Sequence, residues 1–183
     1  MPLLMLKDLP RYECLLEASR LFPDLDPSAC EVYLQVLRTG DEVFEVESRY
    51  LKALGISQGR FTVLMQLTEP QVGCGQGPVA LSPAVIADRA GVTRATVTGL
   101  IDMLERDGFV LRTPAEHDRR MMTVSLTKAG EAFVASLLPG YFQRVAAIMR
   151  GLTEEERRVL VKLLLKIQDG TVVAEARSSV AAK

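Results

Sequence analysis

Apolar side chains recur at helical spacing along most of this chain, and the pattern changes most clearly between residues 109 and 126. Before that stretch, Val97, Leu100, Ile101 and Leu104 form one stripe of a helix. Within it, residues 109–112 and 121–126 alternate between apolar and polar positions, which is typical of two short strands. The polar residues 113–120 between them predict a connecting loop. The pattern therefore predicts a helix followed by a β hairpin.

Capping residues mark where the helices before this hairpin begin and end. Ser82 is placed to cap a first helix, and Gly91 suits the left-handed conformation that would end it. Thr93 is placed to cap a second helix that runs to about Asp107. Two short helices, a tight turn and a hairpin in this order predict a winged helix-turn-helix domain over residues 56–127. The expected fold class is mainly α with a small β wing.

The outward face of the second helix carries small or hydrogen-bonding side chains beside one cation. Such a face can approach base edges in the major groove, and Arg94 lies where the positive end of a helix favours phosphate. In the loop of the hairpin, the adjacent Arg119 and Arg120 can enter a narrow, electronegative minor groove. The residues expected to contact double-stranded DNA are Ser82, Thr93, Arg94, Ala95, Thr96, Thr98, Arg119 and Arg120.

Further helices are expected on both sides of this domain. Residues 10–22 form a short amphipathic pattern, and Ser28 with Glu31 resembles a capping box that opens a long helix to about Leu54. After the hairpin, one helix is expected over residues 127–150. Another is opened by a capping box at residues 153–156. Each helix has an apolar stripe that the winged domain is too small to cover.

These stripes predict assembly into a homodimer. The expected organisation is an N-terminal extension with dimerisation helices (1–55), the winged domain (56–127), C-terminal dimerisation helices (128–175) and a frayed tail (176–183). Residues from about 9 to 40 and 141 to 170 are expected to hold the dimer. Two recognition helices would then lie about one DNA turn apart, roughly 34 Å, on a pseudo-palindromic operator.

Several short motifs occur together across this region. They are Leu81-Ser82-Pro83, Gly91-Val92-Thr93, Asp107-Gly108, Asp118-Arg119-Arg120 and Leu126-Thr127-Lys128-Ala129-Gly130. With them, residues 28–170 resemble the multiple-antibiotic-resistance regulator (MarR) family of winged-helix transcriptional regulators. The resemblance implies a dimer formed by the terminal helices, a minor-groove contact by Arg120 and a backbone contact by Arg119. Position 99, often basic in this family, is Gly99 here, which implies weaker direct readout of bases.

The resemblance also implies an effector pocket between the dimerisation helices and the winged domain. Tyr33, Phe44 and Met65 would give it an apolar lining and Arg49 a carboxylate partner, so a small phenolic or aromatic acid is the expected ligand. The pattern alone places Tyr33, Phe44 and Met65 in the core, and Arg49 can instead pair with Glu45. The expected function is a dimeric repressor that such a ligand releases from DNA.

Two alternatives remain open at this stage. Some members of the family sense peroxides through a cysteine early in the first long helix, and Cys30 lies in that region, with Cys14 and Cys74 elsewhere. A redox-responsive regulator is therefore the first alternative. The second is a winged-helix module that binds proteins rather than DNA, although Arg119 and Arg120 favour DNA.

Composition argues against several other classes of protein. The 183 residues have a net charge of −1, and no run of 18 apolar residues or signal-peptide arrangement is present, so a cytoplasmic protein without a membrane span is expected. Three widely spaced cysteines argue against a disulfide framework, and together with a single histidine, His117, they form no metal-binding cluster. Residues 73–77 are rich in glycine but lack the Lys-Ser/Thr pair of a phosphate-binding loop. No enzyme, cofactor or metal site is expected.

Overall fold

The computed structural model describes residues 3, 8–68, 79–114 and 121–181. The described elements are α1 (Tyr12–Leu21), α2 (Pro27–Ala53), α3 (Gln58–Leu67), α5 (Pro83–Ala90), α6 (Arg94–Arg106), β1 (Val110–Pro114), β2 (Met122–Leu126), α7 (Lys128–Ile148), the 3₁₀ turn η1 (Met149–Gly151) and α8 (Glu154–Ala181). The chain divides into two compact units, residues 1–139 and 140–183. The predicted fold class, mainly helical with a two-stranded wing, is confirmed.

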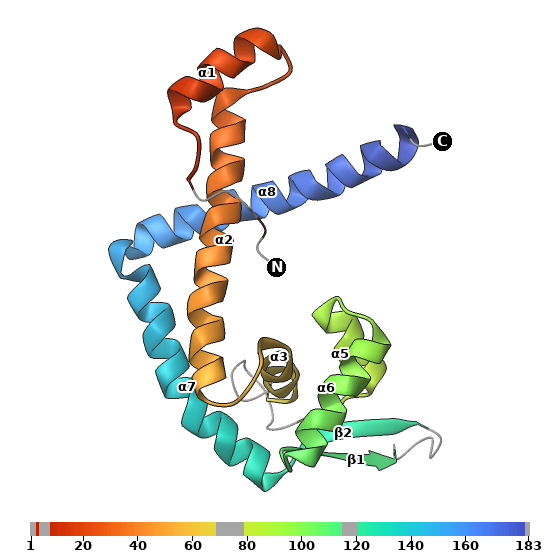
Figure 1. The fold of residues 1–183 in the computed structure, drawn as a ribbon. Helices are drawn as coiled ribbons and strands as arrows, with labels where there is room; N and C mark the ends of the chain where they lie inside the picture. The colour runs from red at the N-terminus through yellow and green to blue at the C-terminus, as the bar shows by residue number, and fades with distance from the viewer. Residues whose placement is uncertain (1–2, 4–7, 69–78, 115–120, 182–183) are drawn as a thin grey trace. The chain divides into compact units, whose positions relative to one another are not determined.

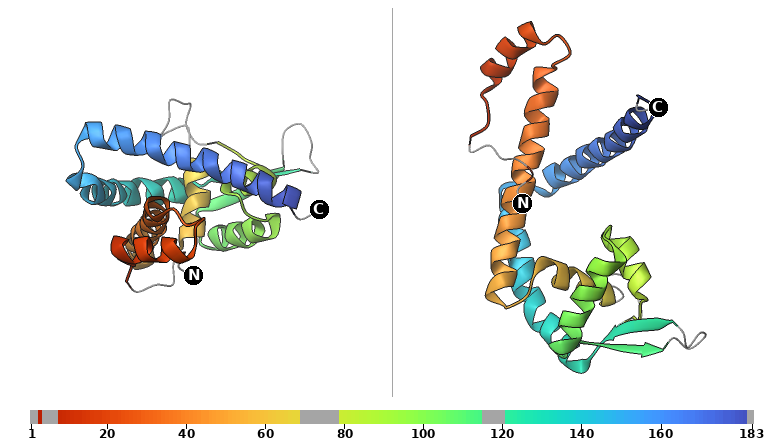
Figure 2. Two further views of the ribbon diagram at one scale, coloured as in Figure 1. Left: turned by 90° about the horizontal axis from the view of Figure 1, so that it is seen from above. Right: turned by 45° about the vertical axis from the view of Figure 1, so that its right-hand side comes forward.

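The core of the first unit lies around α6, which packs against α3, α5 and β1. Figures 1 and 2 show α5 and α6 side by side, with the β hairpin extending from the end of α6. The strands are antiparallel, from the pair Val110 and Leu126 to the pair Pro114 and Met122. The buried apolar residues of this core include Phe61, Val63, Leu64, Leu67, Ile86, Val97, Ile101, Leu104, Val110, Val124 and Leu126.

The turns of the winged region follow the expected capping chemistry. Side-chain oxygens of Ser57, Ser82 and Thr93 each accept a hydrogen bond from the backbone N–H three residues later. Gly91 follows α5 with a φ of 63°, a conformation that residues with a Cβ rarely adopt. The sequence therefore predicted the starts of α5 and α6 and the turn between them correctly.

The long helix α2 begins differently from the prediction. Its N-cap is Asp26, whose carboxylate accepts hydrogen bonds from the backbone N–H groups of Ser28 and Ala29 at 2.9 and 3.1 Å, and Pro27 is the first helical residue. The capping box expected at Ser28 is therefore wrong, because Asp26 already satisfies the N–H groups of the first turn. The backbone hydrogen bond from Ala29, followed by the one from the Ser28 hydroxyl, lowers the pKa of Asp26.

Three other boundaries or faces differ from the sequence prediction. β1 extends through Thr113 and Pro114, which the sequence pattern places in the loop, because these two residues still pair with Thr123 and Met122 of β2. The sequence pattern places Val85, Ile86 and Ala90 on the apolar face of α5; Ile86 is buried as expected, whereas Val85 is exposed and Ala87 is buried. α8 continues to Ala181, so the stretch expected as a frayed tail from residue 176 is helical as far as that residue.

The second unit contains the end of α7, η1 and α8. The predicted capping box opens α8: the backbone N–H of Thr153 donates to Glu156 Oε2 at 2.7 Å, and the N–H of Glu156 donates to Thr153 Oγ1 at 3.2 Å. The hydrogen bond from the backbone N–H of Thr153, followed by the one from the Thr153 side chain, lowers the pKa of the Glu156 carboxyl. No α8 side chain that the structure describes is buried, including Leu160, Leu163 and Leu164.

One helical stretch in the described part of the chain, Lys128–Gly151, has the length and mean hydropathy of a membrane-crossing segment, although the sequence predicts no such span. A single helix of this kind is weak evidence, because helices that pack on a protein core pass the same test. Gly130, Val134 and Leu137 of α7 are buried within the first unit, which accounts for part of its apolar character.

Candidate nucleic-acid interface

Helix α6 presents two faces of different chemistry. Val97, Ile101 and Leu104 are fully buried and fix the helix to the core of the first unit. Ala95 and Gly99 lie nearly opposite them on the helical repeat and are exposed. A Cβ placed on Gly99 would meet no atom within 4 Å. The outward surface of the first two turns therefore carries small side chains at these positions, and another molecule can approach the helix closely there.

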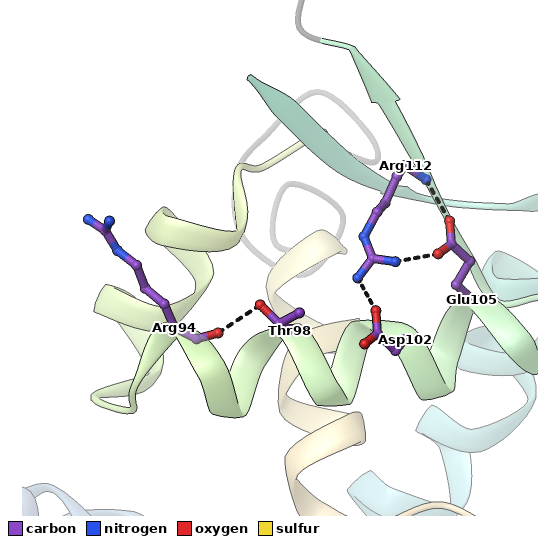
Figure 3. Close-up of polar contacts among 5 residues, drawn as sticks. All are labelled: Arg94, Thr98, Asp102, Glu105 and Arg112. Atoms are coloured by element: carbon purple, nitrogen blue, oxygen red, sulfur yellow. Dashed lines mark hydrogen bonds and ion pairs between the residues drawn. The ribbon is translucent and has the colours of Figure 1, made fainter. Parts of the chain in front are cut away.

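The first turn of α6 combines three engaged hydroxyl groups with a free cation. Thr93 Oγ1 accepts a hydrogen bond from the N–H of Thr96 at 3.2 Å and lies 2.9 Å from the Thr96 hydroxyl, while the Thr98 hydroxyl donates to the Arg94 carbonyl at 2.9 Å. The guanidinium of Arg94 has no hydrogen bond or ion pair with the described residues, and Figure 3 shows it extending away from the helix. A free cation at the positive end of a helix dipole favours an anion such as phosphate.

A second arginine, Arg112 on β1, is held in place between two carboxylates of α6. Its guanidinium pairs with Asp102 and Glu105, and its backbone N–H donates to Glu105 Oε1 at 3.3 Å (Figure 3). Burial opposes the charge on Arg112, but the hydrogen bonds and negative charges of the two carboxylates outweigh it and raise the pKa of the guanidinium. We call this group of three side chains the wing clamp, because it joins the wing to the second half of α6.

Sequence reasoning did not predict the wing clamp. Asp102 and Glu105 are three residues apart on the polar side of α6, and this spacing was the available signal. Their partner, however, lies on a strand, and the pairing between a helix and a strand depends on tertiary structure that periodicity does not specify.

The end of α6 has a further attachment, to α3. Arg60 Nη1 lies 2.6 Å from Asp107 Oδ2, and Arg60 Nη2 donates to the carbonyl oxygen of Gly55 at 2.6 Å. The Arg60 side chain is mostly buried, so the pair is more shielded from water than an ordinary surface ion pair. Arg60 therefore holds together the turn after α2, helix α3 and the C-terminal end of α6.

The end of the wing is fixed to α7 by Thr127 and Gly130. The Thr127 hydroxyl donates to the carbonyl oxygen of Gly108 at 2.7 Å and accepts from the N–H of Gly130 at 3.0 Å. A Cβ on Gly130 would lie 2.0 Å from the carbonyl oxygen of Phe109, so the backbone requires glycine there. The Leu-Thr-x-x-Gly motif of the sequence thus fastens the hairpin to the helix that follows.

Comparison with known proteins supports the winged-helix interpretation and extends it to most of the chain. The model of the MarR family matches residues 56–122. The transcriptional repressor YetL of Bacillus subtilis is 35% identical over 87% of this chain and 92% of its own length. The chain belongs to the MarR family. It is therefore a member of a family of transcriptional regulators rather than of enzymes.

Other MarR relatives and structures agree with this assignment. The transcriptional regulator PrsX of Escherichia coli is 32% identical over 67% of this chain and 72% of its own length. The crystal structure of YusO from Bacillus subtilis is 25% identical, with a TM-score of 0.54, over 78% of this chain and 94% of YusO. The structure of the S. aureus MepR–DNA complex has the same fold, with a TM-score of 0.62 at 21% identity over 76% of this chain and 95% of MepR.

The structure brings most of the expected MarR DNA contacts to one region. Arg94, Ala95, Thr96 and Thr98 are exposed on the first turns of α6, and Thr93 is exposed as its cap. Ser82 caps α5 and is partly buried. The remaining predicted contacts, Arg119 and Arg120, and also His117, lie outside the described residues.

The residues expected to line an effector pocket lie apart from the hollow that the structure describes. Tyr33 and Phe44 are exposed on α2 and so are not core residues of the single chain, and Arg49 lies 3.8 Å from Glu45 as an exposed ion pair. Met65 is partly buried on α3. An open hollow of about 450 Å³ lies instead at the turn between α2 and α3, lined by Ser48, Lys52, Gly55, Ile56, Ser57, Gln58 and Arg60.

Proposed function

We propose that this chain is a dimeric, sequence-specific DNA-binding repressor of transcription that acts in the cytoplasm. The observation that carries the proposal is the first turn of α6. The guanidinium of Arg94, which has no hydrogen bond or ion pair with the described residues, extends from the start of a helix that carries the exposed small residues Ala95 and Gly99 and whose opposite face is buried. This arrangement suits insertion into a major groove, with the wing at the adjacent minor groove. The MepR–DNA complex supports the proposal through its shared fold.

Selection from a randomised duplex library tests the DNA-binding part. We expect a pseudo-palindromic sequence to be enriched and its affinity to fall with increasing salt. Arg94→Ala should weaken binding by about 1–3 kcal/mol, and Arg120→Ala should do the same if the wing arginine enters the minor groove. Lys162→Ala on α8 is a matched control that also removes one charge. If no sequence is enriched, the winged domain is a protein-interaction module instead.

The dimer part of the proposal rests on the apolar surface of the terminal helices. Leu160, Leu163 and Leu164 remain between 37% and 50% exposed on one side of α8. A second copy of the chain can cover such a stripe. We expect a solution mass of twice 20.1 kDa. Leu160→Asp with Leu164→Asp should give monomer or aggregate without DNA binding, whereas Lys162→Asp should stay dimeric.

Release by a small aromatic or phenolic acid is the proposed mode of regulation. The hollow at the α2–α3 turn supports it, because Lys52 at its rim has no ion pair with the described residues and can attract a carboxylate. Tyr33, Phe44, Arg49 and Met65 remain candidates for the lining in a dimer. A screen of phenolic acids for release of bound DNA tests this, and Lys52→Gln should weaken the response.

Thiol oxidation is the competing mode of regulation. Cys14 is exposed on α1 and Cys30 is partly buried on α2, whereas Cys74 lies outside the described residues. A variant with all three cysteines changed to serine distinguishes the two modes. If peroxide releases the native protein from DNA but not this variant, the redox mode replaces the ligand mode. If peroxide releases neither and a phenolic acid releases both, the ligand mode stands.

A further inference from the structure

The hydrogen-bonding groups on the exposed face of α6 are largely occupied within the protein. The Thr93 and Thr96 hydroxyls bond to each other, and the Thr98 hydroxyl donates its proton to the carbonyl oxygen of Arg94. Farther along the helix, Asp102 and Glu105 are held by Arg112 in the wing clamp. The guanidinium of Arg112 neutralises these two carboxylates and occupies part of their accepting capacity, which makes them weaker acceptors for a cytosine amino group.

Two kinds of contact to base edges are the least committed to other groups on this face. The first is the fork of Arg94, which matches the two acceptors of a guanine or a phosphate. The second is apolar: Ala95 ends in a methyl group, and Thr98 keeps a methyl group once its hydroxyl turns toward the Arg94 carbonyl, as Figure 3 shows. Gly99, about one turn after Ala95, adds no side chain to this face, so the helix can approach the groove closely here.

From these observations we infer that α6 reads its operator chiefly through the 5-methyl groups of thymine, which contact the methyl groups of Thr98 and Ala95. The major groove of an A·T pair presents this methyl group, and small apolar side chains are its usual protein contact. The preferred half-site therefore contains thymines under the first two turns of α6, with at most one guanine placed by Arg94. This inference rests on the proposed DNA binding and specifies which duplexes the site accepts.

Replacing thymine with deoxyuridine tests the inference without altering the protein. In the duplex selected from the random library, each thymine of a half-site is replaced in turn, which removes one methyl group and keeps base pairing. Loss of one buried methyl group should lower the affinity about fourfold, and the same replacement in both half-sites should lower it about 16-fold. Deoxyuridine placed outside the protected region is the control and should change nothing.

A matched pair of variants identifies the protein group in the contact. Thr98→Val keeps the methyl group and removes the hydroxyl, whereas Thr98→Ser keeps the hydroxyl and removes the methyl group. We expect Thr98→Val to bind like the native protein and Thr98→Ser to lose about fourfold. Thr98→Ser should also no longer distinguish thymine from deoxyuridine at the contacted position, because the two changes remove the same contact.

The possible results separate this inference from the proposed function. If the selected duplex binds equally well with thymine or deoxyuridine at every position, the methyl contact is refuted while DNA binding stands. If Thr98→Val loses affinity while Thr98→Ser binds like the native protein, the Thr98 hydroxyl reads the base and the inference is again refuted. If no duplex is selected at all, the proposed DNA binding fails and the inference fails with it.

Discussion

The wing clamp gives the sharpest prediction for stability. Arg112→Met removes the guanidinium that pairs with Asp102 and Glu105 but keeps the backbone hydrogen bond to Glu105 and much of the side-chain volume. The Arg112 side chain is 24% exposed and its partners 52% and 40%, so each pair contributes about what a surface ion pair does, roughly 0.2–1 kcal/mol. Loss of the arginine also leaves two carboxylates three residues apart, which repel by about a few tenths of a kcal/mol.

These contributions give an expected loss in the free energy of unfolding of about 1–2 kcal/mol. For a chain of this size that corresponds to a fall in Tm of roughly 3–6 °C. Urea unfolding measures the loss, and Arg112→Lys should recover part of it because a lysine keeps the charge but cannot pair with both carboxylates at once. Part of the loss should disappear at high salt, which screens the half-exposed pairs.

A double-mutant cycle tests the cause of this loss. Arg112→Met in a background of Asp102→Asn and Glu105→Gln should cost much less than in the native background. An equal cost in both backgrounds would show that packing of the arginine stem, not the ion pairs, stabilises the wing. DNA binding gives a second check: a salt slope reduced by about one would mean that Arg112 contacts phosphate, contrary to its place in the clamp.

Three further predictions concern single positions. Gly99→Ala should raise the free energy of unfolding by about 0.5–1 kcal/mol, because the added Cβ meets open space and alanine favours helix. Gly130→Ala should lower it by about 1–3 kcal/mol, because its Cβ would collide with the carbonyl oxygen of Phe109. The unfolding temperatures of the two variants should therefore shift in opposite directions. Gly99→Lys should strengthen binding to unrelated duplexes and steepen the salt dependence, as titration of a nonspecific duplex would show. The pKa of Asp26 is lowered in the folded state, so its contribution to stability is present above the ordinary pKa of 3.8 and is lost as the pH falls through the folded-state pKa. Asp26→Asn should remove this pH-dependent contribution, which urea unfolding between neutral and acidic pH measures.

Local chemistry explains why much of the winged domain could be predicted from the sequence. Ser82 and Thr93 are caps because a short hydroxyl side chain can satisfy the N–H groups of a first helical turn. Gly91 ends α5 because that position needs a positive φ. In each case the determining contacts lie within a few residues, so the pattern along the chain carries the information.

The errors arise where two groups compete for one role or where a partner is distant. Asp26 and Ser28 could each cap α2, and the sequence alone did not show that the carboxylate takes the N–H groups. Tyr33 and Phe44 were expected in the core from their apolar character, yet both are exposed in the single chain. A helical stripe shows that a surface is apolar, but it does not show whether the same chain or another copy covers it.

The arrangement of contacts along α6 separates the part that fixes the helix from the part that faces outward. The second half is held by ion pairs to two other elements, through Arg112 on β1 and through Arg60 on α3. On the exposed face of the first two turns, the polar contacts among the described residues are the helix's own cap and the Thr98 bond to the Arg94 carbonyl. Changes at Ala95, Thr98 or Gly99 therefore alter the exposed surface without breaking a contact that positions the helix. Substitutions on the exposed face of a helix attached in this way can therefore change its surface chemistry while the wing and the core keep their geometry.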